Sequence, residues 1–395
     1  MNTIDIPRQH TESDYKNGHI LFRDFRHYQY ELLPEILQAC VSYISKQNNN
    51  FLEVNQLNFK SYNTYYGVYN NEYYEIELIV NNKKTSQTKT FLRMYFPRLI
   101  DGSYFIINGN TYIPTIYILD KPITLKAGSI KLYSLFNSLT LFLKDDVCIF
   151  TGVNIPSSYF IQLFFNDTPH EHLYDDNVEK FKLTHDYHQD DELINYFNRT
   201  FNLHATTRNQ VIEYFEKLFF DQYTEGLYAM CYNDVSLYNL IKQSLIMLLN
   251  ETSPSFIDLK NKRLVFIELL LSPLLKYIGK IAKSAANGYT FDEVNMKLDE
   301  LTKYFIKTTN KQKQSDSGLD GNYLFSSANL YESILEHKCS FVNPGSTNPP
   351  NEIAALHDTH YKVLCPITVA DMQPGHTVSV IPDTVVDYFG NFKNI

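Results

Sequence analysis

The stretch "SYFIINGNTYIPTIYI", Ser103 to Ile118, has two runs of β-branched and aromatic residues on either side of Asn108-Gly109. Asn and Gly both tolerate positive φ, so this pair predicts a tight turn of type I′ between two antiparallel strands. Pro114 cannot donate a backbone hydrogen bond, which predicts that the second strand lies at a sheet edge or carries a bulge. The stretch therefore predicts a β-hairpin.

Strand-like sequence extends on both sides of this hairpin. It begins at Tyr73 and is interrupted by the polar connection "NNKKTSQTK" at residues 81–89. It resumes from Thr124 to Ser157, where β-branched and aromatic residues again recur. The first part of the chain is therefore predicted to be rich in β-strands.

Helical spacing dominates from about Asp190 to Lys313, most clearly in "DVSLYNLIKQSLIMLLNE" and "TFDEVNMKLDELTKYFIKTT". Asp234 and Thr290 are the predicted N-caps of these two helices. The stretch "KQSDSGLDGN" at 313–322 is predicted to be a flexible junction, and the sequence after Asn343 has little periodicity. Strands followed by helices indicate an α+β fold.

The composition describes a globular chain of 395 residues with 44% hydrophobic and 20% charged residues. The most apolar stretch, "LVFIELLLSPLLKYIG" at 264–279, contains charged residues and is too short to cross a bilayer, so we expect a buried helix there. The first ten residues lack the pattern of a secretory signal, and five cysteines without a CxxC motif suggest a reducing compartment. We therefore expect a cytoplasmic protein without a membrane segment.

The charge is unevenly distributed. The net charge of −9 argues against a nucleic-acid-binding protein that acts alone, yet residues 260–313 carry eleven Lys or Arg against five acidic residues. Lys276, Lys280 and Lys283 follow the spacing of one helical face, which suits either phosphate contacts or plain solvation.

Two histidine-containing stretches are candidate metal sites. His357, His360, Cys365 and His376 match no common zinc spacing, so local ordering of a loop is the preferred interpretation. A nucleophilic pair of Cys365 and His360 is weaker still, because such partners normally come from separate parts of a fold. Four more histidines lie in an acidic stretch at 167–192, for which a solvated loop is preferred over a divalent-ion site.

Three segments in collinear order resemble the N-terminal part of the β subunit of multisubunit DNA-dependent RNA polymerase. The first is "YFPRLIDGSYFIINGNTYIPTIYILDKP" at 95–122, and the second is "DLKNKRLVFIELLLSPLLKYIGKIAKS" at 258–284. The third is "SILEHKCSFVNPGSTNPPNEIAALHDTHYKVLCPITVADMQPG" at 333–375, in which the His-Lys, Pro-Gly, Thr-His-Tyr and Cys-Pro-Ile groups match the β pattern. The detailed match covers roughly a third of the chain.

The resemblance implies the β-subunit regions called protrusion, lobe and fork. The protrusion would comprise residues 1–122 and 255–315, a reduced lobe residues 123–254, and the fork residues 316–395. Residues implied to lie near nucleic acid or the active centre, with positioning and electrostatic roles, are His337, Lys338, His357, His360, Lys362 and Asp371. Lys276, Lys280 and Lys283 would lie on DNA-facing basic helices.

The resemblance also implies that this chain supplies no catalytic residue and binds no metal. Nucleotidyl transfer needs Mg²⁺, which a β′-like partner chain would hold. The chain ends at Ile395, before the β residues nearest the catalytic centre, so we expect a split β subunit like those of giant-bacteriophage polymerases, acting in the host cell cytoplasm. The expected partners are a C-terminal β fragment, β′-like chains, the DNA template and the RNA–DNA hybrid, with a promoter-specificity factor left open.

Several positions depart from the β pattern, and some of these form the rifampicin pocket in the family. We therefore expect the assembled enzyme to resist rifampicin. The departures are Tyr117, Asp120, Cys339, Val363 and Asp371. The alternative to a transcription enzyme is a non-catalytic structural or virion protein that retains a β-like fold.

Overall fold

The computed structural model has an α+β fold, as the sequence predicts. It describes residues 20–21, 32–47, 52–66, 69–82, 87–98, 105–107, 110–114, 116–126, 128–142, 147–165, 189–232, 235–249, 257–265, 268, 271, 275, 294–295, 319–320, 338–340, 356–365, 377–381 and 384–393. The chain divides into two compact units. Unit 1 comprises Met1–Asp120 and Ser255–Ile395, and unit 2 comprises Lys121–Pro254.

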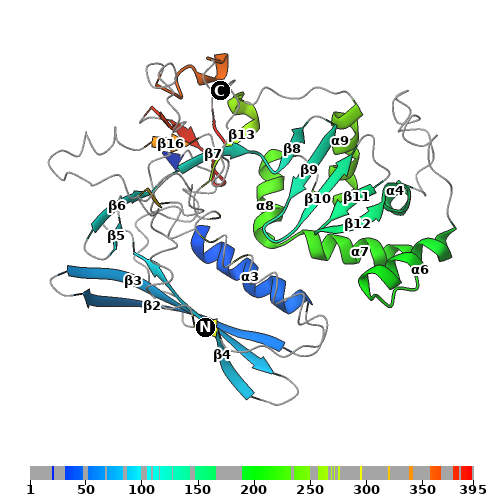
Figure 1. The fold of residues 1–395 in the computed structure, drawn as a ribbon, viewed down its shortest axis with the longest axis horizontal. Helices are drawn as coiled ribbons and strands as arrows, with labels where there is room; N and C mark the ends of the chain where they lie inside the picture. The colour runs from blue at the N-terminus through cyan, green and yellow to red at the C-terminus, as the bar shows by residue number, and fades with distance from the viewer. Residues whose placement is uncertain are drawn as a thin grey trace. The chain divides into compact units, whose positions relative to one another are not determined.

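A long antiparallel hairpin dominates the first part of unit 1 (Figure 1). Strand β2 (Leu52–Tyr66) pairs along its whole length with β3 (Tyr69–Asn82), which pairs in turn with β4 (Gln87–Pro97). The connection between β3 and β4 lies within the polar stretch that was predicted to join two strands. Strand β14 (Val294–Asn295) adds to the other side of β4 in parallel.

The hairpin predicted around Asn108-Gly109 is confirmed. Strand β5 (Phe105–Ile107) pairs with β6 (Asn110–Pro114), and the register of Ile107 with Asn110 leaves two residues for the turn. The predicted edge position of the second strand is wrong, because β15 (Leu319–Asp320) pairs with β6 on its other side. Pro114 is tolerated there as the last residue of the strand, beyond the end of its pairing with β5.

A four-stranded sheet, the junction sheet, joins distant parts of unit 1. Its order is β13-β7-β16-β17. The strands are β7 (Ile116–Asp120), β13 (Lys262–Val265), β16 (Lys338–Ser340) and β17 (Thr377–Ser379). Strand β13 is antiparallel and β16 parallel to β7, whereas β17 is antiparallel to β16.

Helix α3 (Leu33–Gln47) and the last described segment of the chain also contact each other. The buried residues of α3 recur at helical spacing on one face, including Leu33, Ile36 and Cys40. Tyr388 donates a hydrogen bond from its hydroxyl to Glu35 Oε2 at 2.6 Å, and β1 (Ile20–Leu21) pairs with β18 (Val385–Val386).

Unit 2 is a five-stranded antiparallel meander accompanied by helices. The sheet order is β12-β11-β10-β9-β8, the reverse of the chain order. Its strands are β8 (Ile123–Lys126), β9 (Ser129–Tyr133), β10 (Ser138–Phe142), β11 (Val147–Phe150) and β12 (Val153–Pro156). Its described helices are α4 (Ser157–Phe165), α6 (Asp190–Phe201), α7 (Arg208–Phe219), α8 (Gln222–Cys231) and α9 (Leu237–Leu249).

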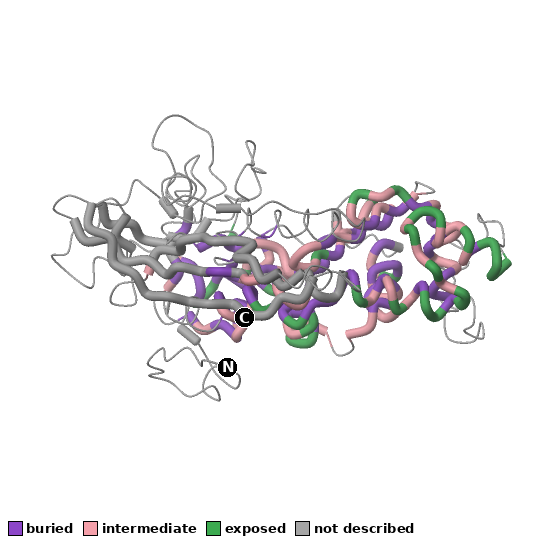
Figure 2. The backbone as a smooth tube through the Cα atoms, turned by 90° about the horizontal axis from the view of Figure 1, so that it is seen from below, coloured by how far each residue is buried: buried purple, intermediate pink, exposed green. Residues whose placement is uncertain are grey.

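The core of unit 2 is aromatic. Phe150, Phe160, Phe197 and Phe215 are fully buried, and three of these rings meet Phe215 edge-to-face at centroid distances of 4.9–5.6 Å. Buried and half-buried residues alternate along β9, β10 and β11, and in Figure 2 the helices alternate between buried and exposed colours. The unit therefore buries one face of its sheet and one stripe of each helix.

Capping residues fix several helix ends in unit 2. Thr207 and Gln210 form a capping box at the start of α7, and Asp221 accepts from Thr224 N–H at the start of α8. Arg208 donates to the carbonyls of Leu163 and Gln162, at 2.7 and 2.9 Å, in the last turn of α4. These contacts satisfy backbone groups that a helix leaves open at its ends.

Several local predictions need correction. Residues 294–295 form a strand, not part of the predicted 290–309 helix, because they pair with β4; Thr290 lies outside the described residues. Helix α9 begins at Leu237, and Ser236 accepts from Asn239 N–H at 3.2 Å; the predicted N-cap Asp234 lies outside the described residues. Leu264 and Val265 belong to β13, so the expected helix of 264–279 does not begin at Leu264. Leu319 and Asp320 are paired in β15, within the stretch predicted to be a flexible junction.

No helix among the residues that the structure describes is long and apolar enough to cross a membrane.

Candidate functional site

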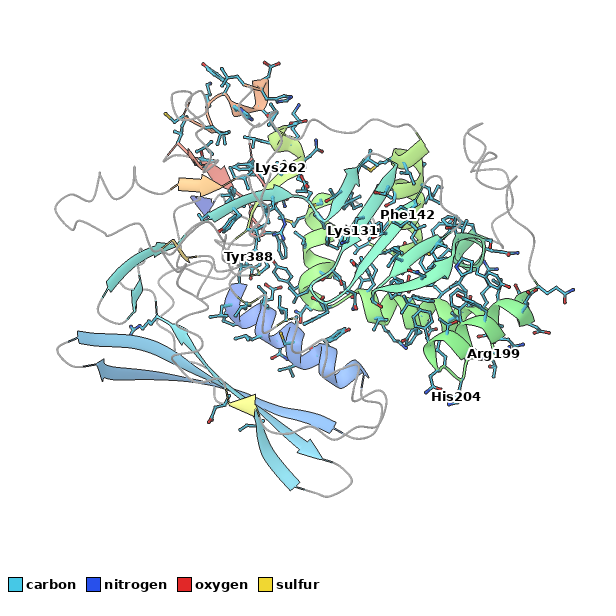
Figure 3. The ribbon with its side chains drawn as sticks, viewed as in Figure 1. Lys131, Phe142, Arg199, His204, Lys262 and Tyr388 are labelled. Atoms are coloured by element: carbon cyan, nitrogen blue, oxygen red, sulfur yellow. The ribbon has the colours of Figure 1, made fainter. Side chains whose placement is uncertain are left out.

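The candidate site lies in unit 1, where the junction sheet meets two turns, one at 356–365 and one at 384–393. Figure 3 labels Lys262 on β13 and Tyr388 in the second turn. The site is built from stretches that are far apart in sequence, and some of the contacts described below join these stretches while others order one turn locally.

An ion pair ties β7 to β13. Lys262 Nζ contacts Asp120 Oδ1, and the backbones of the same two residues are paired in the sheet. The Lys262 side chain is 2% exposed, whereas that of Asp120 is 35% exposed. A buried ammonium requires a compensating charge, which the Asp120 carboxylate supplies. This pair explains locally why an acid stands at position 120.

Arg263 on β13 forms a second ion pair and also contacts the 384–393 turn. Arg263 Nη1 contacts Glu268 Oε1 at 2.7 Å and also donates to the carbonyl of Phe389 at 3.2 Å. Both charged side chains are nearly buried, at 11% and 13% exposure. The guanidinium therefore holds the turn through a backbone atom.

The 384–393 turn is organised by Asp387, whose side chain is buried. Its carboxylate accepts from the backbone N–H groups of Phe389 and Asn391 at 3.0 and 2.9 Å, and from Asn391 Nδ2 at 2.8 Å. Lys393 Nζ lies 3.7 Å from the same carboxylate. An Asp that accepts several local backbone bonds is typical of a tight turn.

Gly390 allows this turn to approach β13 closely. Its φ is +83°, and a Cβ at this position would lie 2.3 Å from the carbonyl oxygen of Leu264. Leu264 N–H in turn donates to the Gly390 carbonyl at 2.8 Å. Both the positive φ and the close backbone approach require glycine.

The 356–365 turn contains the short 3-10 helix η5 (Asp358–His360) and is anchored to residues 257–259. Leu259 N–H, at the start of η3 (Leu259–Asn261), donates to Thr359 Oγ1 at 3.0 Å. His360 Nε2 lies 2.8 Å from the carbonyl of Ile257. The residues joined by these two contacts are 100 and 103 positions apart in the sequence.

The hydrogen bonds of His360 specify one neutral tautomer. A carbonyl can only accept, so Nε2 carries the proton toward Ile257, while Nδ1 accepts from His357 N–H at 3.4 Å. Burial is the largest influence and lowers the pKa of His360 below its usual 6.5. Three smaller effects partly offset one another: the Ile257 carbonyl and Asp258 raise the pKa, and His357 lowers it. The neutral form is therefore the one that fits the turn.

The predicted site residues have different outcomes. His357 and His360 lie in this turn, where His357 Nδ1 lies 2.8 Å from Thr359 Oγ1. Lys362 is exposed at the end of the same turn, and Lys338 lies in β16 opposite Ser379. The others lie outside the described residues. They are His337, Asp371, Lys276, Lys280 and Lys283.

The described residues include no cluster of side chains suited to binding a metal ion. No group of three His, Cys, Asp or Glu side chains that could hold an ion occurs among the described residues. Both nitrogens of His360 are occupied by backbone groups. His376 and the histidines of the acidic stretch lie outside the described residues.

Sequence reasoning missed the residues that hold the two turns in place. Thr359 was noted only as part of the Thr-His-Tyr match, and no role was predicted for Asp387 or Gly390, although an Asp followed three residues later by Gly is typical of a type I turn. The exposure of Tyr361, which belongs to the same Thr-His-Tyr group, was also not predicted, because exposure cannot be read from a tyrosine in a tyrosine-rich chain.

The chain matches no protein-family model, and no curated protein matches it.

Proposed function

We propose that the chain is the N-terminal part of the β subunit of a multisubunit DNA-dependent RNA polymerase. One observation carries the proposal: the three segments that resemble this subunit become neighbours in one sheet. Strand β7 comes from the first segment, β13 from the second and β16 from the third. Separate chance resemblances would have no reason to be adjacent in space.

The division of the chain supports the same proposal. Unit 2 is inserted between Asp120 and Ser255, and the expected insertion of a lobe into a protrusion spans residues 123–254. The pairing of β7 with β13 brings together the chain on either side of the insertion. In the proposed assignment, unit 2 is the lobe, and unit 1 contains the protrusion and the fork.

In this role the chain would act by position and charge. It would form one wall of the DNA cleft and place the 356–365 turn beside the RNA–DNA hybrid. Partner chains would complete the enzyme, and a β′-like chain would hold the Mg²⁺ that activates the RNA 3′-hydroxyl. Isolated from those chains, the protein is expected to synthesise no RNA.

The test is purification of the tagged chain from its native source, with mass spectrometry of the co-purifying proteins and an assay of DNA-templated RNA synthesis. The proposal predicts a C-terminal β part and β′-like chains in stoichiometric amounts, together with RNA synthesis. Recovery of the chain alone, or with capsid proteins and without RNA synthesis, would establish the structural-protein alternative.

A further inference from the structure

Tyr361 is the most exposed of the large hydrophobic residues for which the structure describes exposure, at 77%. It is held on an ordered backbone, because its N–H donates to the Asp358 carbonyl at 3.2 Å and its neighbours His360, Val363 and Leu364 are buried. A large ring that is exposed on an anchored turn leaves its apolar surface in water and so does not add to the stability of the core. A single exposed ring is ordinary on a protein surface, so the proposal depends on the positive charge that adjoins it.

Lys362 adds a positive charge beside this ring. The residue is exposed, and its Nζ lies 5.4 Å from the centroid of the Tyr361 ring. Its φ of +63° is unusual for a residue with a Cβ. Val363 and Leu364 N–H groups, both donating to the His360 carbonyl at 3.1 and 2.9 Å, continue the turn that sets this conformation.

We propose that Tyr361 and Lys362 together bind one unpaired nucleotide. The base would stack on the Tyr361 ring, and the Lys362 ammonium would attract the adjacent phosphate. Aromatic stacking with a nearby cation is how proteins bind single strands with little sequence preference. This proposal rests on the proposed function, which places the 356–365 turn near nucleic acid, and adds the residue that touches a base.

A polypeptide partner fits this surface less well. Leu356 is 63% exposed and would suit an apolar protein contact. However, a protein that covered Tyr361 would also desolvate the Lys362 ammonium at 5.4 Å, which is unfavourable unless the partner supplies an acid. The exposed Asp358 is the one acid in the described turn, and neutralising it should strengthen oligonucleotide binding.

The test measures fluorescence anisotropy of the full-length chain with a labelled twelve-nucleotide oligo-dT and with an abasic oligomer of the same length and charge. We expect tighter binding to oligo-dT, and Tyr361→Ala should reduce that affinity about tenfold, within the range of about 1–3 kcal/mol for one stacked base. Tyr361→Phe should retain it, whereas Lys362→Ala should weaken binding to both oligomers.

Tyr133 provides a matched control in unit 2. Lys131 Nζ lies 4.7 Å from its ring centroid, but the residue is only 38% exposed. Tyr133→Ala should leave oligo-dT affinity unchanged, and circular dichroism of each variant should match the wild type. The proposal would be overturned by undetectable binding, by equal affinity for the two oligomers, or by a Tyr361→Ala variant that binds like the wild type.

The outcomes separate this inference from the proposed function. If the purified polymerase contains the chain but Tyr361→Ala leaves oligo-dT binding unchanged, only the nucleotide site is wrong. If Tyr361→Ala instead prevents co-purification of partner chains without affecting oligo-dT binding, Tyr361 is a protein contact and the nucleotide site is again wrong. Recovery of the chain without polymerase-like partners would contradict the proposed function, whatever the binding assay gives.

Discussion

Unit 2 takes its described strands and helices from one continuous stretch of chain and packs them around buried phenylalanine rings. The junction sheet of unit 1 takes its strands from four separate stretches, and charged side chains and backbone contacts stabilise it; Asp120 and Lys262 are 142 residues apart. Apolar packing tolerates small displacements, whereas a close backbone approach or a buried ion pair requires one geometry. The two regions should therefore respond to substitution in different ways.

Phe215→Ala should produce the largest effect and confine it to unit 2. The ring is fully buried against Phe150, Phe160 and Phe197, so its loss should lower the free energy of unfolding by about 3–5 kcal/mol. Hydrogen exchange with mass spectrometry would locate the loss of protection. The control is Phe142→Ala, since Phe142 on β10 is only half-buried (Figure 3). Equal effects of the two substitutions would contradict the assigned core.

Gly390→Ala should destabilise unit 1 by about 3 kcal/mol, because the new Cβ meets the Leu264 carbonyl and φ is positive. Gly152→Ala is the matched control: its φ is +82°, yet nothing lies within 4 Å of the added Cβ. The control should cost only about 1 kcal/mol, the conformational part of the effect. Urea denaturation of both variants would measure the difference, and similar midpoints would mean that β13 and the 384–393 turn are not in contact.

Substitutions of the Asp120–Lys262 pair should have unequal effects. Asp120→Ala removes the carboxylate that faces a buried ammonium and should cost about 2–3 kcal/mol. Lys262→Met removes the buried charge and leaves a carboxylate that reaches solvent, so it should cost less than about 1 kcal/mol. The double variant should recover most of the stability lost in Asp120→Ala. Additive losses in a double-mutant cycle would show that the two residues do not interact.

The pH dependence of the 356–365 turn should be the smallest effect. Burial lowers the pKa of His360 in the folded protein, so below pH 6.5 the unfolded chain binds more protons than the folded one. Stability from this residue is therefore fully present above pH 6.5 and is lost as the pH falls toward the lower, folded-state pKa.

His360→Gln tests this dependence, because its amide can still donate toward the Ile257 carbonyl but does not titrate. Urea midpoints measured from pH 7.5 down to 5.0 should fall less for this variant than for the wild type. His204→Gln removes an exposed histidine and should retain the wild-type dependence. A His360→Gln variant with an unchanged pH profile would contradict the assigned role.

The sequence predicted the elements whose signals are local. The Asn108-Gly109 hairpin, the strand-rich stretch from Thr124 to Ser157 and the helical character of the chain after Asp190 follow from turn residues and periodicity. It did not predict β14 and β15, because two-residue strands depend on partners in distant segments. The residues around Val294 have helical spacing, but such spacing is only a weak preference for a helix. The pairing of Val294 with Leu92 outweighs it.

The site was predicted by residue type more than by arrangement. The spacing of His357 and His360 drew attention to the 356–365 turn, but its contacts with residues 257–259 could not be inferred from the sequence alone. Gly390 illustrates the same limit, because glycine is required there by the close approach of the Leu264 carbonyl, which is far away in the sequence. The function assigned to this junction stays a proposal.

Omission and add-back of the chain in a reconstituted polymerase would test the central claim most directly, with template-directed RNA synthesis as the readout. We predict that the complex without the chain makes no RNA and that wild-type chain or Gly152→Ala restores synthesis. Gly390→Ala should fail to restore it, because it disrupts the junction. Full RNA synthesis in the absence of the chain would contradict the proposal that it is part of the enzyme.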